Sequence, residues 1–278
     1  MGIRVQTNTA SLNALRNLSQ TVAVDQASSE KLSSGSRVNK AADDAATLSI
    51  SSKLNAEIRS QSQGIRNASD GISLLQTAEG GLSEISNILV RLRELAIQSS
   101  TGTVGQNERV FIDREAQIMV SRISQVAKST QYNGMKLLAS HDEDFQIHMG
   151  GGVKAGQEEV YVIDRSEFHS TAARLGLDEM NFSSQDSSQE ALGLIDRAIN
   201  RTSSRRSAIG ALQNRITSGK GVAENSNQNK VSSQSQMKDA DFAQTLSENA
   251  KSKILEMAGM AVLSQANSSA SIALKLIG

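Results

Sequence analysis

The chain has 278 residues with 29 basic and 29 acidic side chains, so its formal net charge is zero. A neutral chain has no overall field to attract it to nucleic acid or to an anionic membrane, and neither is expected as a partner. It contains no cysteine, which excludes a disulfide framework, and no proline or tryptophan; aromatic residues make up only 3%. Few aromatic side chains leave a compact core hard to fill, and no proline interrupts a helix. The composition therefore favours long helices packed along their length.

An apolar stripe of helical spacing opens the chain and comprises Leu12, Leu15, Leu18 and Val22. No apolar run precedes it that could be a cleavable signal peptide, and no segment approaches the ~20 apolar residues of a membrane span. The stripe is too narrow to support an isolated helix in water. We therefore expect this helix to need a partner, either in the same chain or in a neighbouring one.

Residues 32–46 read LSSGSRVNKAADDAA and contain two adjacent aspartates, Asp43 and Asp44. Paired carboxylates can hold a metal or exchange protons, but no third ligand or base is evident nearby. Carboxylates are also favoured at the start of a helix, where they cap free N–H groups and face the positive end of the macrodipole. Arg37 and Lys40 are close enough in sequence to neutralise them. We interpret Arg37, Asp43 and Asp44 as helix-start and interface residues.

The longest predicted helix covers residues 48 to about 99, where apolar residues follow two seven-residue series. The first series comprises Leu54, Ala68, Leu75, Leu82, Leu89 and Ala96, and the second comprises Ile58, Ile65, Ile72, Ala78, Ile85 and Leu92. The second series shifts by one place, as expected for a helix with closer to 3.6 than 3.5 residues per turn. About 50 helical residues would be ~75 Å long, which indicates a coiled-coil-like rod. Gly80 and Gly81 are its weakest internal point.

A polar loop at residues 100–106 precedes a second amphipathic helix carried by Ile112, Ala116, Met119, Ile123 and Val126. Asn133 and Gly134 then predict a tight turn. Beyond it, apolar residues alternate at 145–149 and 160–163 around a glycine-rich stretch, residues 150–156. This pattern predicts a small β-hairpin element within residues 135–186.

A third helix is predicted to start near Ser187, and its apolar period weakens over the polar residues 224–236. The period resumes in a terminal helix whose stripe comprises Leu246, Ala250, Ile254, Met257 and Ala261. The predicted fold is therefore mainly α: an elongated antiparallel helical rod or coiled coil with a small β-hairpin element in the middle of the chain. The two terminal helices are expected to pack on each other or on neighbouring chains.

No pattern typical of an enzyme or a cofactor site stands out. His141, His148 and His169 lack a second ligand at helical spacing, and there is no glycine-rich phosphate loop or nucleophile elbow. The basic run 201–206 has Arg201 and Arg205 one turn apart, which we interpret as a solvated or salt-bridged helix face. We expect no catalytic residue, no metal and no cofactor.

Several motifs, in order along the chain, are similar to those of bacterial flagellins, the subunits of the flagellar filament. They are LNALRNL at 12–18, KLSSGSRVNKAADDAA at 31–46, NASDGIS at 67–73, QTAEG at 76–80, LRELAIQ at 92–98, TQYNG at 130–134, GALQNR at 210–215, DAD at 239–241 and ILEMAGMAVLSQAN at 254–267. The resemblance covers about 1–140 and 187–278, and its several independent motifs make it specific.

The resemblance implies a subunit that assembles with itself, and possibly with other flagellins, into the filament used for swimming. In the family the terminal helices form a coiled coil in the filament core. This implies a core helix with its connecting segment at 1–44, a rod domain at 45–238, and a C-terminal core helix at 239–278. The subunit-interface residues would be the two terminal stripes named above.

The resemblance also implies secretion in an unfolded state through the flagellar type III export apparatus, with an export chaperone and cap proteins as partners. The protein would then reside outside the cell, in the filament. Two alternatives stay open: a hook–filament junction protein of the same family, and a non-flagellar coiled-coil scaffold.

Many flagellins bind an innate-immune Toll-like receptor, and the family's receptor motif aligns its arginine and leucine with Arg91 and Leu95. Those residues are four apart and so share a helix face. The preceding glutamine of the motif is Val90 here, and a family glutamate on the second helix aligns with Arg122. A reversed charge can leave a clash at an interface. We therefore expect weak or no receptor binding through Arg91, Leu95 and Arg122.

Overall fold

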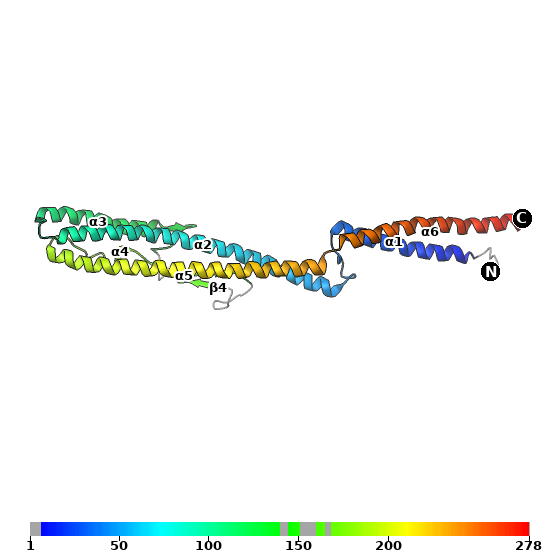
Figure 1. Ribbon diagram of the computed structural model, residues 1–278, viewed down its shortest axis with the longest axis horizontal. Helices are drawn as coiled ribbons and strands as arrows, with labels where there is room; N and C mark the ends of the chain where they lie inside the picture. The colour runs from blue at the N-terminus through cyan, green and yellow to red at the C-terminus, as the bar shows by residue number, and fades with distance from the viewer. Residues whose placement is uncertain (1–6, 140–143, 151–159, 165–167, 278) are drawn as a thin grey trace. The chain divides into compact units, whose positions relative to one another are not determined.

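The computed structural model describes residues 7–139, 144–150, 160–164 and 168–277. The helices are α1 (Thr9–Ser34), α2 (Ala45–Ser100), α3 (Gln106–Ser129), α4 (Ala172–Leu175), α5 (Gln185–Lys238) and α6 (Phe242–Ile277). The short strands are β1 (Gln131–Tyr132), β2 (Met135–Lys136), β3 (Phe145–His148) and β4 (Val160–Ile163). The mainly α fold with a small β element is confirmed (Figure 1).

The chain divides into two compact units, which we call unit 1 (residues 1–56 and 229–278) and unit 2 (residues 57–228). In unit 2, α2, α3 and α5 lie side by side and share one apolar core (Figure 1). The two series predicted along α2 point into that core from Ala68 onward, and Leu75, Leu82 and Leu89 are completely buried. The core is filled mainly by aliphatic side chains, as the composition predicted; Phe182 is its largest completely buried member.

Two antiparallel hairpins join α3 to the rest of unit 2. Tyr132 pairs with Met135 across the turn at Asn133 and Gly134, whose φ angles of 48° and 79° are both positive. Asparagine and glycine are the residues that tolerate this geometry in a two-residue turn. In the second hairpin Phe145 pairs with Ile163. The strands predicted at 145–149 and 160–163 are therefore confirmed, while residues 151–159, which include most of the predicted glycine-rich loop, lie outside the described residues.

Glycines of α2 let the second hairpin approach the helix closely. A Cβ atom added to Gly64 would collide with the backbone of Met149, and one added to Gly71 would collide with the Ile147 side chain. Gly80 has no neighbour within 4 Å of its Cβ position, and α2 continues through it without a break. The glycines of α2 therefore have different roles, and those beneath β3 are required by packing.

The polar stretch 224–236 does not interrupt the helix, although the sequence pattern weakens there. α5 continues to Lys238. In unit 2 the Asn227 amide donates to Ser62 Oγ at 3.3 Å, and in unit 1 the Gln234 amide donates to the carbonyl of Ser51 at 3.2 Å. In this stretch, polar side chains of α5 make the contact with α2. Earlier along α5, apolar side chains pack in the core of unit 2.

Unit 1 contains α1, α6 and the adjoining ends of α2 and α5. The segments that connect these helices pair with each other: Arg37 N donates to the carbonyl of Lys238 at 2.7 Å, and Ala240 N donates to that of Gly35 at 3.0 Å. Gly35 ends α1 in the left-handed conformation, with a φ of 66°. The predicted segment boundaries, 44/45 and 238/239, coincide with the start of α2 and the end of α5, although the compact units divide at 56/57 and 228/229. The domain division itself stays a prediction.

Candidate functional site

The contact surface between α1 and α6 is made largely of small and polar side chains. Asn249 is only 6% exposed, and its amide nitrogen lies 3.0 Å from Asp25 Oδ1, 3.1 Å from Ser28 Oγ and 2.9 Å from Ser29 Oγ. Thr245 and Ser252, one turn to either side, are also buried. Buried polar groups must be satisfied to avoid a desolvation cost, and this cluster satisfies the Asn249 amide within the unit.

Helices α1 and α6 stay in contact as far as the N-terminus of α1. A Cβ atom at Gly259 would lie 3.2 Å from Leu18 Cδ1, so glycine allows the close approach. Asn8 caps α1 by accepting from Ser11 N at 3.0 Å and donates to the carbonyl of Ala266 at 2.9 Å. Ser11 Oγ donates to Asn267 Oδ1 at 2.9 Å. Polar contacts therefore set the register of α1 against α6 at both ends.

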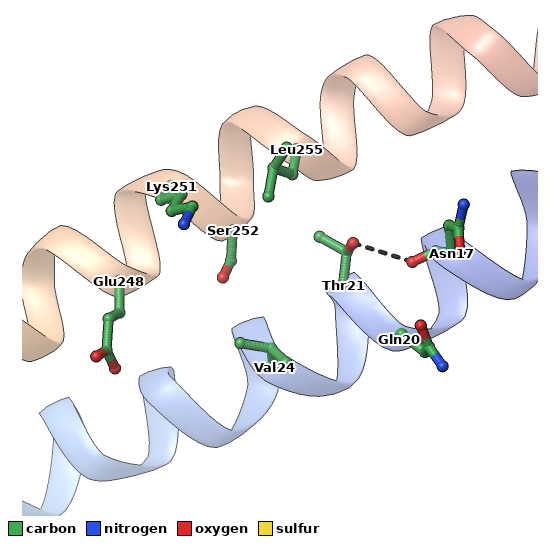
Figure 2. A pocket seen from close by; sticks show the side chains of 8 residues that line it. All are labelled: Asn17, Gln20, Thr21, Val24, Glu248, Lys251, Ser252 and Leu255. Carbon is green, nitrogen blue, oxygen red and sulfur yellow. Dashed lines mark hydrogen bonds between the residues drawn. The ribbon is translucent and has the colours of Figure 1, made fainter.

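A groove follows the line where α1 and α6 meet. Figure 2 shows its eight lining side chains, four from each helix: Asn17, Gln20, Thr21, Val24, Glu248, Lys251, Ser252 and Leu255. Its volume is about 460 Å³. A second hollow of about 240 Å³ shares Asn17, Thr21 and Leu255 with the first and extends it toward Val262. The groove is open, and Thr21 is held in it by a 3.0 Å hydrogen bond to the carbonyl of Asn17.

The two predicted interface stripes point mostly away from this contact. Leu18 and Val22 are half-buried. The other predicted residues are exposed: Leu12, Leu15, Leu246, Ala250, Ile254, Met257 and Ala261. Leu15 is 52% exposed, Ile254 63% and Met257 59%. We call these seven exposed residues of the two helices the outward apolar face of unit 1.

The residues that do join α6 to α1 were not identified from the apolar pattern. They form their own helical series, spaced alternately by four and three places: Thr245, Asn249, Ser252, Glu256, Gly259, Leu263 and Ala266. All of them are buried or half-buried. The sequence does contain this contact as a helical period of mostly small and polar residues. Apolar periodicity alone does not reveal it.

The predicted helix-start residues occupy the connection between α1 and α2. Asp44 Oδ1 accepts from Thr47 N at 3.0 Å and Oδ2 accepts from the Thr47 hydroxyl at 2.6 Å, so Asp44 caps α2. Asp43 Oδ2 accepts from the backbone N–H groups of Asn39 and Lys40, both at 3.0 Å. These bonds lower the pKa of both carboxyls.

Arg37 holds the same connection to the segment after α5. Its Nη2 donates to the carbonyl of Met237 at 2.9 Å, besides the backbone bond to Lys238. Lys40 Nζ lies 2.7 Å from Glu30 Oε2, and this pair raises the pKa of Lys40. The charged residues of the connection are thus engaged in local structure.

The residues aligned with the receptor motif do not share one exposed face. Arg91 is exposed and pairs with Glu94 at 2.9 Å and with Glu115 at 3.0 Å. Leu95 is only 1% exposed and packs in the core of unit 2, so the exposed surface around Arg91 does not include it. Arg122 is exposed and donates to Gln125 Oε1 at 3.0 Å. Weak or absent receptor binding stays a prediction.

The described residues contain no group of three or more metal-ligating side chains. His141 lies outside them, while His148 and His169 belong to the hairpin region of unit 2. Among the described residues, no helix has the length and apolarity that a membrane crossing requires.

Residues 5–142 match the family described as the bacterial flagellin N-terminal helical region, and residues 192–277 match the bacterial flagellin C-terminal helical region. A flagellin of Halalkalibacterium halodurans is 36% identical over 270 residues, which cover 97% of this chain and 98% of that relative. The crystal structure of Bacillus cereus flagellin is similar with a TM-score of 0.50 at 24% identity, covering 56% of this chain and 88% of that one.

The structure of a putative flagellar hook-associated protein from Vibrio parahaemolyticus has a TM-score of 0.59. It covers 71% of this chain and 100% of that one, but its 14% identity shows a shared fold alone. The family matches lie at both ends of the chain, where α1 and α6 form their polar contact, and the identity to a flagellin extends over nearly all of both proteins. The chain belongs to the bacterial flagellin family.

Proposed function

We propose that this flagellin is a structural subunit of the flagellar filament and that its copies join through the outward apolar face of unit 1. The observation that supports the proposal is the exposure of large aliphatic side chains along both terminal helices, including Leu15, Ile254 and Met257. Apolar side chains that repeat at helical spacing and yet stay exposed, as they do along α6, are typical of a protein–protein interface. Burying one such side chain stabilises by about 1.5–3 kcal/mol, and a helical polymer would repeat that gain at every subunit.

The polar contact between α1 and α6 supports the same proposal. Because Asn249, Ser28 and Ser252 make the contact within the chain, the aliphatic side chains are left available for other chains. A polar contact also fixes the register of a helix pair, since a shift by one turn would leave Asn249 buried without partners. The terminal pair would then present its apolar face in one defined arrangement.

Assembly is tested by placing a charge on the outward apolar face. Ile254→Asp and Leu15→Asp should each abolish filament formation by the full-length protein, observed by electron microscopy at high protein concentration. An unpaired buried charge costs several kcal/mol, which corresponds to at least about a hundredfold rise in the concentration needed for assembly. The helical content and thermal unfolding of unit 2 should be unchanged, because neither residue belongs to its core.

Two variants serve as controls. Ile254→Leu keeps the apolar volume and should still polymerise. Asn200→Asp adds the same charge on an exposed position of α5 in unit 2 and should polymerise as well. Normal filaments from either Ile254→Asp or Leu15→Asp would contradict the proposal.

We extend the proposal to the export of the subunit before assembly. It would leave the cell unfolded through the flagellar type III export apparatus, bind an export chaperone and be added at the filament tip beneath cap proteins. These steps follow from membership of the family, whose members form an extracellular filament. The proposal includes no catalytic activity and no cofactor.

A further inference from the structure

Three arginines converge on one cavity of unit 2. Arg174 comes from α4, while Arg201 and Arg205 lie one turn apart on α5. The cavity is an open hollow on the surface with a volume of about 710 Å³. It is lined by four exposed residues, Ala173, Arg174, Arg201 and Ser204, and by two half-buried ones, Arg205 and Ala208. Its lining thus combines three cationic side chains, one hydroxyl and two methyl groups, with no carboxylate among them.

Two of the guanidinium groups are held in place by hydrogen bonds. Arg201 Nη1 donates to the carbonyl of Leu175 at 3.2 Å, at the end of α4. Arg205 Nη1 donates to Ser170 Oγ at 3.1 Å. Each bond uses only part of a guanidinium, which has five N–H donors, so donors remain for a ligand.

The positive charges of the three arginines act unfavourably on one another. Burial, followed by the charges of Arg174 and Arg201, lowers the pKa of Arg205. Within the described part of the chain, none of these three arginines forms an ion pair. Other arginines of unit 2 do: Arg91 with Glu94 and Glu115, Arg93 with Asp196, and Arg206 with Glu79.

The sequence of α5 also offers Arg201 and Arg205 few acidic partners. Between Asp196 and Glu224 there is no acidic residue, so α5 has no carboxylate of its own within reach of Arg201 or Arg205. Residues 201–206 were interpreted as a solvated or salt-bridged helix face; Arg201 is exposed to solvent, and Arg206 pairs with Glu79. Arg201 and Arg205 line the cavity together with Arg174, and no acidic residue is among its described lining residues.

We propose that this cavity binds a small multivalent oxyanion of the phosphate class. Planar guanidinium groups form paired N–H···O bonds with phosphate oxygens, and three of them can balance more than one negative charge. The Ser204 hydroxyl adds a neutral donor to the same cavity. The cavity is larger than one phosphate group, so pyrophosphate or a phosphate ester fits as well as free phosphate. This proposal is independent of filament assembly.

The test measures binding of pyrophosphate, inorganic phosphate and ADP to the full-length monomer by calorimetry and by thermal unfolding. Sodium chloride at matched ionic strength is the reference. Pyrophosphate should raise the unfolding midpoint of unit 2 above the chloride reference, because a ligand that binds only the folded state stabilises it. ADP binding as tightly as pyrophosphate would identify phosphate esters as ligands, while weaker ADP binding would identify the free anions.

Arg174→Gln is the most informative variant, since the Arg174 side chain makes no hydrogen bond to the residues that the structure describes. It should lower pyrophosphate affinity by about tenfold, as expected for loss of one charge-assisted contact of 1.4 kcal/mol. Arg197→Gln removes the same charge from an exposed position of α5 outside the lining and should stay within about twofold of the unchanged protein. A midpoint no higher than in chloride, or equal losses in both variants, would overturn the proposal.

Discussion

Units 1 and 2 use their apolar side chains in opposite ways. In unit 2 the large aliphatic residues of α2, α3 and α5 point inward, and Leu75, Leu82 and Leu89 are completely buried. Among the described residues of unit 1, Val38 is the one buried apolar side chain, and the contact between α1 and α6 centres on Asn249 and Ser28. The same helical period therefore builds a core within unit 2 and an outer surface in unit 1.

The difference has an energetic consequence. Each aliphatic side chain fully buried in unit 2 contributes about 1.5–3 kcal/mol, and its core contains many of them. A net hydrogen bond contributes about 0.5–1.5 kcal/mol, and unit 1 relies mainly on such bonds between α1 and α6. We infer that unit 2 is stable alone, whereas the terminal helices of unit 1 gain most of their stability from neighbouring subunits.

The largest expected effect is a difference in amide hydrogen exchange between the two units of the monomer. Exchange in α1 should be at least about a hundredfold faster than in α3, because α1 opens without exposing a core. Mass spectrometry of peptic fragments measures both helices in one experiment. In the assembled filament, α1 and α6 should become strongly protected.

A slow exchange in monomeric α1, comparable with that in α3, would mean that the polar contact alone holds α1 and α6 together. Asn249→Ala tests whether the polar contact holds α1 and α6 together in the monomer, because it removes the donor shared by Asp25, Ser28 and Ser29. If the contact holds the pair in the monomer, this variant should accelerate exchange in α1 and leave α3 unchanged.

A smaller effect is expected from Gly64→Ala, which tests how tightly the core of unit 2 is packed. The added methyl group meets the backbone of Met149, which cannot turn aside as a side chain can. Overpacking of this kind costs about 1–3 kcal/mol, measured as a loss in the free energy of unfolding of unit 2.

Gly80→Ala is the matched control on the same helix. Its Cβ position has no neighbour within 4 Å, and alanine is favoured over glycine inside a helix by about 1 kcal/mol. This variant should therefore stabilise unit 2 slightly. A stabilising Gly64→Ala would show that β3 does not pack against α2 as described.

Much of unit 2 could be predicted from the sequence because its core follows an apolar period. The two series along α2 predicted buried positions such as Leu82 and Ile85, and alternation predicted β3 and β4. Leu95 was expected to share a helix face with Arg91, but a spacing of four turns a helix by about 400°, which leaves two residues some 40° apart. At the edge of a buried stripe, that offset is enough to put Arg91 outside and Leu95 inside.

The contact in unit 1 could not be predicted in the same way. The apolar stripes of the terminal helices were expected to pack on each other or on neighbouring chains; within the chain, residues such as Thr245 and Asn249 make the contact between α1 and α6. A hydrophobic pattern indicates which face will be buried in the functional state, and does not say whether the partner is the same chain. The continuity of α5 through residues 224–236 was missed for a related reason, since polar pairing with α2 carries no apolar signal.

The smallest expected effect concerns the acid sensitivity of the cap that begins α2 in unit 1. The hydrogen bond from the Thr47 hydroxyl, followed by that from Thr47 N, lowers the pKa of Asp44 below its ordinary value of 3.8. Because the folded state binds this proton more weakly than the unfolded chain, the stabilisation is complete above pH 3.8 and is lost as the pH falls through the lower folded pKa. An NMR titration of the Asp44 carboxyl carbon should place its midpoint below 3.8. Asp44→Asn keeps a capping side chain that does not titrate, so the amide shift of Thr47 should then lose its acid transition; a midpoint at or above 3.8 would show that Asp44 does not cap α2 in solution.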